Sequence, residues 1–285
     1  PYQSVSTFAG NPYFIDLDVL HQKGLLTLKE LKENIHNTKR VDYGWLFCNR
    51  YNVLRKAYAR FLKKGGEEDV AYTKFVRKNK SWIEDYSLFM ALKVHYNYCS
   101  WNNWADEHKD VNKARKQKAA FADECGFWKW IQFEFDSEWQ ALRKYCHKKG
   151  IVIIGDMPIY VAHDSMDVWQ APRQFLLDEK FNPTVVAGVP PDGFSPDGQL
   201  WGNPIYNWKL MKEDGFKWWK NRVRASFNLY DILRIDHFRG FAGYYTVPYG
   251  DTTARNGWWE SAPGIELFKA INETFPKAKI IAEDL

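Results

Sequence analysis

The sequence predicts an α/β protein in which parallel strands alternate with crossover helices. After Gly150, short apolar runs typical of buried strands alternate with stretches whose apolar residues recur at helical spacing. A carboxylate follows each of these strand-like runs, and in α/β folds functional groups collect where parallel strands end. The length of 285 residues allows two domains or one large α/β barrel.

The first half of the chain predicts helices rather than strands. Residues 1–45 are rich in Pro, Gly and Asn, so we expect loop with short extended pieces. Residues 46–150 are expected to be mostly helical. The first helix covers Asn49–Lys64, where apolar side chains recur at helical spacing, and Gly65 ends it.

Two further helices are predicted in the same segment. Ser81 precedes Glu84 by the spacing of a capping box, which predicts that a helix begins there. A long amphipathic stretch from about Asp123 to Lys149 predicts another helix, and Gly150 ends it.

The second half of the chain predicts strands and helices in alternation. Residues 151–154 form a short β-branched run, as in a strand covered on both faces, and residues 230–235 and 279–282 are expected to be the second and third strands. Amphipathic helices are expected near residues 213–227 and 264–275, between these strands. Such an order gives a parallel sheet with crossover helices.

The predicted strands place charged side chains at one edge of the sheet. Arg234 and Asp236 are two residues apart on a strand, so both point to the same face. An arginine keeps a neighbouring aspartate ionised, and a fixed ionised carboxylate is what a glycosyl nucleophile requires. A structural ion pair at the rim of a barrel explains the same spacing equally well. Any single one of the acids that end the strands, Asp156, Asp236 or Glu283, could instead be a helix N-cap or a solvated loop residue.

Glu283 follows the last apolar strand, where desolvation helps a carboxyl group keep its proton, as a general acid must. Asp236 and Glu283 end successive strands, so their side chains can converge. If they serve as nucleophile and acid, their carboxyl groups should lie about 5–5.5 Å apart.

Residues 188–204 contain four Pro and four Gly, which predicts a long loop. Phe194 and Trp201 lie in this loop. Above a cluster of acids such aromatic rings would be platforms for sugars, whose C–H faces are apolar. A compact loop packed by its own aromatic residues is the alternative.

Several classes of protein are excluded or disfavoured. No apolar run approaches the roughly 18 residues of a membrane span. The net charge of +5 is mild, and the basic cluster at residues 109–118 is typical of a solvated helix, so we expect no nucleic-acid partner. A single-stranded RNA binder would place basic residues among its aromatic ones, whereas acids accompany them here.

The sequence gives no indication of a metal or cofactor site. The four cysteines form no CxxC pair, and no glycine-rich nucleotide motif or HExxH motif occurs. His163 and His237 are isolated and are expected to be hydrogen-bonding groups rather than metal ligands. We therefore expect neither a metal nor a cofactor.

Long motifs resembling those of one enzyme family recur along the whole chain. They are PYQSVSTFAGNPYFIDL from Pro1, VDYGWL from Val41, GDMPIYVAHDS from Gly155, VAGVPPDGFSPDGQLWGNPIYNW from Val186, RIDHFRGF from Arg234 and IAEDL from Ile281. Their order and length resemble the 4-α-glucanotransferases, or amylomaltases, of glycoside hydrolase family 77.

The resemblance implies a role for each matching residue. Asp236 resembles the catalytic nucleophile, Glu283 the general acid/base and Arg234 the arginine that positions the nucleophile. The residues that resemble substrate contacts of the family are Asp156, Trp201 and Gln199 on the donor side, His237 and Tyr2 near glucose, and Tyr43 in a secondary glucan site. Gly193 departs from the family, because some relatives carry tyrosine there.

The fold implied by the resemblance is a (β/α)₈ TIM barrel with helical insertions. Residues 1–45 would be a barrel segment with substrate-binding loops, residues 46–150 a mostly helical insertion, and residues 151–285 the central barrel strands that carry the acids. The family has a third catalytic acid on a later strand, beyond Leu285. We therefore expect this chain to be a fragment that lacks both ends of the barrel.

The activity implied by the resemblance is transfer of an α-1,4-glucan segment to the 4-hydroxyl of an acceptor glucose or maltooligosaccharide. The reaction would retain the anomeric configuration through a covalent glycosyl-enzyme. Such an enzyme would serve starch and glycogen metabolism in the cytoplasm, or in a plastid if the source is a plant. A hydrolase with water as acceptor, or a glucan-binding protein without catalysis, are the alternatives; the latter predicts loss of Asp236 or Glu283, and both are present.

Overall fold

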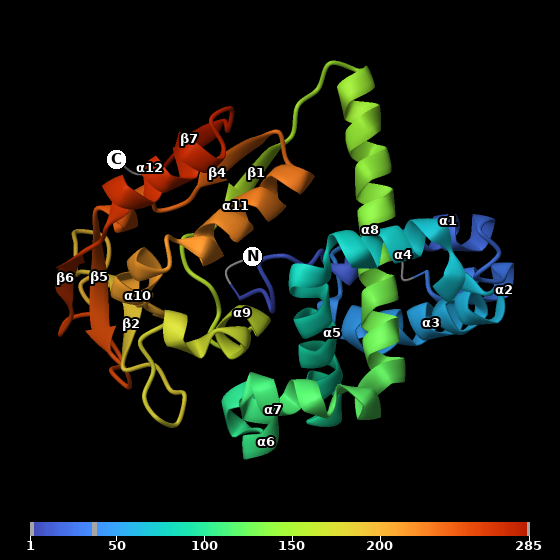
Figure 1. Cartoon of the computed structure of the whole chain (residues 1–285), viewed down its shortest axis with the longest axis horizontal. Helices are drawn as coiled ribbons and strands as arrows, with labels where there is room; N and C mark the ends of the chain where they lie inside the picture. Colours follow the sequence, from blue (N-terminus) through green and yellow to red (C-terminus); the bar gives the residue numbers. More distant parts are fainter. Residues whose placement is uncertain (1–2, 36–38, 284–285) are drawn as a thin grey trace. The chain divides into compact units, whose positions relative to one another are not determined.

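The computed structural model describes residues 3–35 and 39–283, which form two compact units (Figure 1). Unit 1 contains the described residues of 1–8, 96–114 and 143–285, and unit 2 those of 9–95 and 115–142. Within the described ranges no helix is long and apolar enough to cross a membrane.

The boundaries of these units differ from those of the segments expected from the sequence. The described residues of 9–45 belong to unit 2, although we expected residues 1–45 to form one barrel segment with substrate-binding loops. Residues 96–114 cluster with the strands of unit 1, although we expected them in a helical insertion. Compact units are set by contacts in space, so the expected boundaries at residues 45 and 150 do not coincide with theirs.

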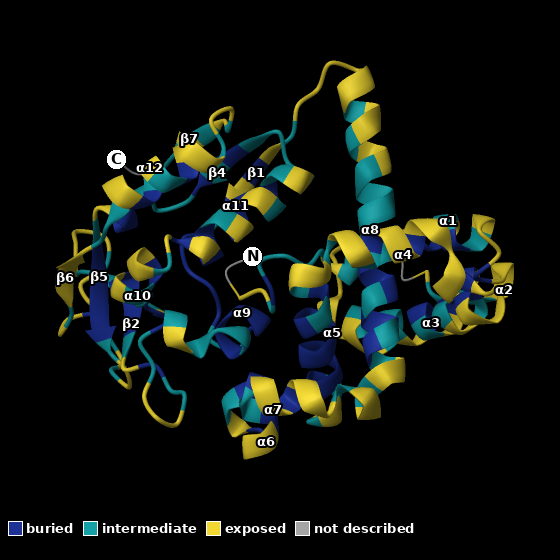
Figure 2. Cartoon of the chain, in the orientation of Figure 1, coloured by how far each residue is buried: buried dark blue, intermediate teal, exposed yellow. Residues whose placement is uncertain are grey.

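The regular elements among the described residues of unit 2 are all helices. Its longer helices are α1 (Leu17–Gln22), α2 (Leu28–Glu33), α3 (Tyr43–Lys63), α4 (Val70–Lys78), α5 (Lys80–His95) and the first part of α8 (Ala122–Lys148). Figure 2 shows the middle of α5 as largely buried. Gly65 and Gly150, just beyond α3 and α8, both have a φ of 72°, which a chain leaving a helix often needs. The helices predicted at 49–64 and 123–149 are thus confirmed.

The prediction of a capping box at Ser81 is wrong. Helix α5 begins one residue earlier, at Lys80, so Ser81 lies inside it. The Glu84 carboxylate forms ion pairs with Lys118 and Lys129 instead. These contacts come from segments distant in sequence, which the local spacing cannot reveal.

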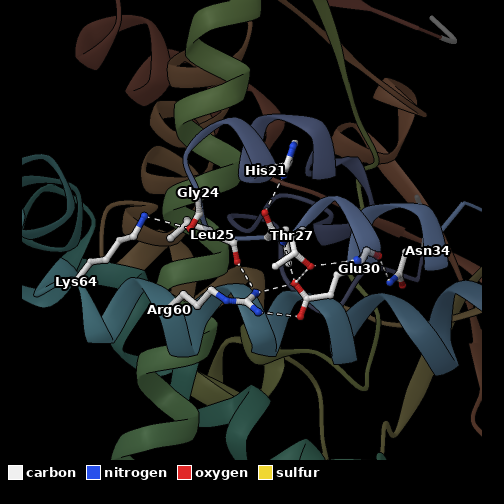
Figure 3. A network of polar contacts seen from close by, with 9 residues as sticks. His21, Gly24, Leu25, Thr27, Glu30, Asn34, Arg60 and Lys64 are labelled. Atoms are coloured by element: carbon white, nitrogen blue, oxygen red, sulfur yellow. Dashed lines mark hydrogen bonds and ion pairs between the residues drawn. The ribbon is translucent and has the colours of Figure 1, made fainter.

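The capping box of unit 2 lies at the start of α2 (Figure 3). Thr27 and Glu30 exchange side-chain and backbone hydrogen bonds there. Arg60 on α3 donates to both oxygens of Glu30, at 2.8 and 2.9 Å, and also to the Leu25 carbonyl. The hydrogen bonds from Arg60 lower the pKa of Glu30 to about 2. A single carboxylate therefore closes the helix end and joins α2 to α3.

Unit 1 contains a parallel sheet in the order β1-β4-β7. Its strands are β1 (Ile154–Met157), β4 (Ile232–Ile235) and β7 (Ile280–Ala282), and its longer helices are α11 (Lys217–Leu229) and α12 (Gly264–Thr274). Strands β1 and β7 both pair with β4 in parallel. The predicted alternation of parallel strands and helices is confirmed for these elements.

The first strand lies later than predicted. We expected residues 151–154, but the ladder begins with Ile154 opposite Ile232 and includes Asp156. Strand β4 starts at Ile232, and the Ile153 carbonyl, just before the ladder, accepts hydrogen bonds from the N–H groups of Asp231 and Ile232. The helix predicted near 213–227 is also interrupted: α10 (Trp208–Glu213) ends before it, and α11 starts after Phe216, whose φ is 58°.

A second, antiparallel sheet in unit 1 has the order β3-β2-β5-β6. Its strands are β2 (Val185–Val189), β3 (Gln199–Pro204), β5 (Gly243–Pro248) and β6 (Trp258–Ser261). The predicted loop over 188–204 is therefore wrong in part, since only residues 190–198 lie between strands. Smaller helices of unit 1 are α6 (Asp106–Lys109), α9 (Met166–Gln170) and α7 (Val111–Lys116), whose last two residues are assigned to unit 2.

Candidate active site

Arg234 joins three carboxylates at the carboxyl ends of the parallel strands. Its Nη1 lies 2.6 Å from Oδ1 of Asp156 and 3.1 Å from Oδ1 of Asp236, and its Nη2 lies 3.3 Å from Oε1 of Glu283. The register explains this, because Asp156 lies directly opposite Arg234 on the neighbouring strand. Ile281 on the other side lies opposite Arg234, which brings Glu283 to the same edge.

The electrostatics of this cluster favour a fixed guanidinium. The hydrogen bond to Asp156 raises the pKa of Arg234 and outweighs the effect of burial, and Asp236 adds to it. Asp236 is the least exposed of the three acids, at 21%, compared with 34% for Glu283 and 57% for Asp156. Asp236 is thus the most shielded of the three carboxylates, and the arginine holds it in one orientation.

A cavity of about 410 Å³ opens beside this cluster. The residues that line it are Gln3, Pro158, Ile159, Tyr160, Gln199, Trp201, Asn203, Asp236 and His237. The Trp201 indole donates to Oε1 of Gln199 at 3.0 Å, and its ring meets the edge of His237 with centroids 5.0 Å apart. Aromatic faces beside a carboxylate suit a sugar ring, which has both apolar and hydroxyl surfaces.

Arg222 on α11 supports one wall of the cavity. It is buried, and its guanidinium donates to the carbonyls of Pro158 and Ile159. The Tyr206 hydroxyl donates to the same Ile159 carbonyl at 2.6 Å. These bonds fix the chain just before Tyr160. Sequence analysis missed Arg222, although a charged residue on the apolar face of a predicted helix was a visible signal.

The N-terminal segment is tied to the same unit by Asp167 on α9. Its carboxylate accepts hydrogen bonds from the Thr7 backbone at 2.8 Å and the Thr7 hydroxyl at 2.6 Å. The Met166 backbone N–H also donates to the Val5 carbonyl. These contacts lie a few residues from Gln3, a cavity residue that sequence analysis did not name.

The remaining candidates lie elsewhere or outside the described residues. Tyr2 lies outside them. Tyr43 begins α3 in unit 2 and is 67% exposed. Phe194 is fully exposed at the tip of the loop between β2 and β3, and Gly193 has open space beside it. His163 lies close to the Phe181 carbonyl, with Nε2 at 2.7 Å from the oxygen.

Taken together, the parallel sheet, the acids at its carboxyl edge and the aromatic cavity define an α/β protein with a carboxylate site suited to a sugar. The chain belongs to the glycoside hydrolase 77 family of 4-alpha-glucanotransferases, whose family model matches residues 1–285.

Individual relatives agree with this assignment. The chain is 48% identical to a 4-alpha-glucanotransferase of Clostridium butyricum and 45% identical to one of Thermus thermophilus. All of this chain is covered in both cases, but only 59% and 57% of the relatives. It also resembles the structure of an amylomaltase from Streptococcus agalactiae in complex with acarbose, with a TM-score of 0.92 and 41% identity over all of this chain and 58% of that one. The chain therefore spans little more than half the length of these relatives.

Proposed function

We propose that the protein containing this chain is a 4-α-glucanotransferase that acts on α-1,4-glucans and maltooligosaccharides by retaining double displacement. The observation that carries the proposal is that Asp236 and Glu283 contact the same Arg234 guanidinium. Two carboxylates held by one group can act on one glycosidic bond. The family of the chain and the names of its relatives support transfer as the activity.

In the first step, an oxygen of Asp236 attacks the anomeric carbon while Glu283 protonates the departing glycosidic oxygen. The bond from carbon to the leaving sugar breaks, and an ester bond to Asp236 forms. Arg234 holds the attacking carboxylate in place. The parallel strands β1, β4 and β7 would be part of a (β/α)₈ barrel.

In the second step, Glu283 takes the proton of an acceptor 4-hydroxyl, whose oxygen displaces Asp236 and restores the α configuration. The rings of Trp201 and His237, which meet edge to face, would form one wall of the donor site, together with Gln199 and Asp156. Transfer prevails over hydrolysis if the site holds a sugar acceptor and excludes water. Tyr43 would serve a secondary glucan site in unit 2.

The test is to incubate the complete natural protein with maltotriose and to resolve the products over time. Glucose together with a ladder of longer maltooligosaccharides is the expected result, and Asp236→Asn should abolish it. Glucose and maltose without longer chains would identify a hydrolase and refute the transfer reaction. Persistence of the ladder in Asp236→Asn would refute the assignment of the nucleophile.

A further inference from the structure

The chain turns sharply at His237, directly after Asp236. Up to this point β4 continues as a regular strand, and the Asp236 N–H still donates to the Met157 carbonyl of β1 at 3.0 Å. His237 then adopts a φ of 52° and a ψ of 50°, the left-handed conformation that few residues other than glycine adopt. The 3₁₀ turn η6 (Phe238–Phe241) follows at once.

This turn directs two consecutive backbone N–H groups at Glu283. The His237 N–H donates to the carboxylate Oε2 at 2.9 Å, and the Phe238 N–H donates to the Glu283 carbonyl at 2.8 Å. The Glu283 N–H donates in turn to the Ile235 carbonyl at 3.2 Å. The main chain around His237 thus holds both the backbone and one carboxylate oxygen of Glu283.

The same conformation determines where the His237 ring lies. In a continuing strand, successive side chains would point to opposite faces, so Asp236 and His237 could not share a cavity wall. The left-handed residue breaks this alternation, and both residues line the cavity. A Cβ at Gly240 would lie 3.0 Å from Cδ2 of His237 and 2.6 Å from Cδ1 of Ile159, so the turn has little room for a larger residue there.

We propose that His237 is a positioning residue for Glu283, and that it acts through its left-handed backbone rather than through its ring. Its N–H fixes the direction from which the Glu283 carboxyl group reaches the glycosidic oxygen. This inference rests on the proposed function, in which Glu283 is the general acid. A change that disfavours the left-handed backbone should therefore impair proton delivery, whereas loss of the ring alone should not.

Two glycosyl donors, maltotriose and α-maltosyl fluoride, allow proton delivery by Glu283 to be measured separately from the rest of the reaction. Maltotriose must have its departing oxygen protonated when the bond to the anomeric carbon breaks. With α-maltosyl fluoride, the fluoride leaves as an anion and needs no proton, while Asp236 forms the same ester bond. The quantity measured is a ratio of two single-turnover rates: the rate at which α-maltosyl fluoride is consumed, divided by the rate at which maltotriose is consumed. A general weakening of the site lowers both rates and leaves this ratio unchanged.

The informative comparison is His237→Asn with His237→Val in the complete natural protein. Both substitutions remove the ring, but asparagine tolerates the left-handed conformation and a β-branched residue does not. We expect His237→Val to raise the ratio at least about tenfold, and His237→Asn to leave it within about twofold of the unsubstituted protein. A ratio unchanged in folded His237→Val, or raised equally in both variants, would overturn the inference.

Glu283→Gln is the benchmark, because it removes the acid itself and should raise the ratio the most. If Glu283→Gln leaves the ratio unchanged, Glu283 is not the general acid, and the proposed function fails rather than the positioning alone. If His237→Val does not fold by tryptophan fluorescence and thermal melting, His237→Ala replaces it, with His237→Gly as its matched control. His237→Ala should then raise the ratio. His237→Gly should not, because glycine adopts the left-handed conformation freely. The same ratio in both variants would overturn the inference.

Discussion

Nη1 of Arg234 lies 2.6 Å from Oδ1 of Asp156, across the pairing of two parallel strands. The same nitrogen lies 3.1 Å from Oδ1 of Asp236. One donor atom therefore links an exposed carboxylate on β1 to the candidate nucleophile after β4. Asp156 can therefore influence the orientation of Asp236 through the guanidinium.

Replacement of Arg234 by lysine should impair the reaction without unfolding the protein. A lysine ammonium is a single point charge and cannot reproduce the planar fork that contacts all three carboxylates. We expect Arg234→Lys to lower kcat for maltotriose on the order of 100-fold, with little change in melting temperature. The control is Arg255→Lys, which alters an exposed ion pair with Asp197; neither residue lines the cavity. Wild-type kcat in Arg234→Lys would contradict the positioning role of this arginine.

Arg222→Lys should destabilise unit 1 and weaken substrate binding. A lysine ammonium cannot donate to the carbonyls of Pro158 and Ile159 with the geometry of the guanidinium, so at least one of these two hydrogen bonds is lost. We expect a loss of about 2 kcal/mol of stability, read as a lower melting temperature, and a higher KM for maltotriose. Arg224→Lys on the same helix is exposed and is the matched control. Equal melting temperatures for the two variants would contradict the supporting role of Arg222.

Asp231 should stabilise unit 1 in a manner that depends on pH. Burial alone would raise the pKa of Asp231, but hydrogen bonds from the Ile153 N–H, Arg143 and His147 hold it far below its usual value of 3.8. A lowered pKa in the folded state adds stability above pH 3.8, and this stability is lost as the pH falls below that value.

Asp231→Asn should therefore lower the melting temperature at pH 7, by the equivalent of about 2 kcal/mol. The difference from the unsubstituted protein should stay constant down to about pH 5 and shrink below about pH 4. Asp106→Asn is the control, because its ion pair with Lys109 involves a side chain that is 91% exposed. A difference that grows on acidification would contradict the prediction.

Glu138 in unit 2 should have the opposite pH dependence. Burial raises its pKa to about 7, although the Asp16 N–H donates to its Oε2 and opposes the shift. A carboxyl group with a raised pKa in the folded state destabilises the protein progressively as the pH rises from its model value of 4.5 to about 7. Glu138→Gln should therefore gain stability relative to the unsubstituted protein over this interval.

The measurement is the difference in melting temperature between Glu138→Gln and the unsubstituted protein at pH 5 and pH 8. We expect the difference to favour glutamine more strongly at pH 8. Glu107→Gln, at an exposed position of α6, should show no such change. A difference that is the same at both pH values would refute a neutral-range titration of Glu138.

Local patterns predicted those parts of the fold in which local interactions dominate. Helical spacing located α3 and α8, and the glycines that end both helices were recognised because the left-handed conformation beyond a helix favours them. The prediction of a capping box at Ser81 was wrong because α5 begins one residue earlier, and the Glu84 carboxylate forms ion pairs with Lys118 and Lys129, which are distant in sequence. The antiparallel sheet was missed because its strands lie among prolines and glycines, whose turn signals obscured β3.

The sequence by itself determined the candidate residues and the family: the acids that follow apolar strands, Arg234 two residues before Asp236, and the motifs that place the chain in its family. Only the tertiary structure decided which carboxylates share the guanidinium, since Asp156 and Arg234 are 78 residues apart and meet through strand register. It also decided that His237 turns toward Glu283 instead of following the alternation of the strand. The order of side chains along one segment can be read from that segment alone. Strand register and the direction of a turn depend instead on contacts between segments distant in sequence.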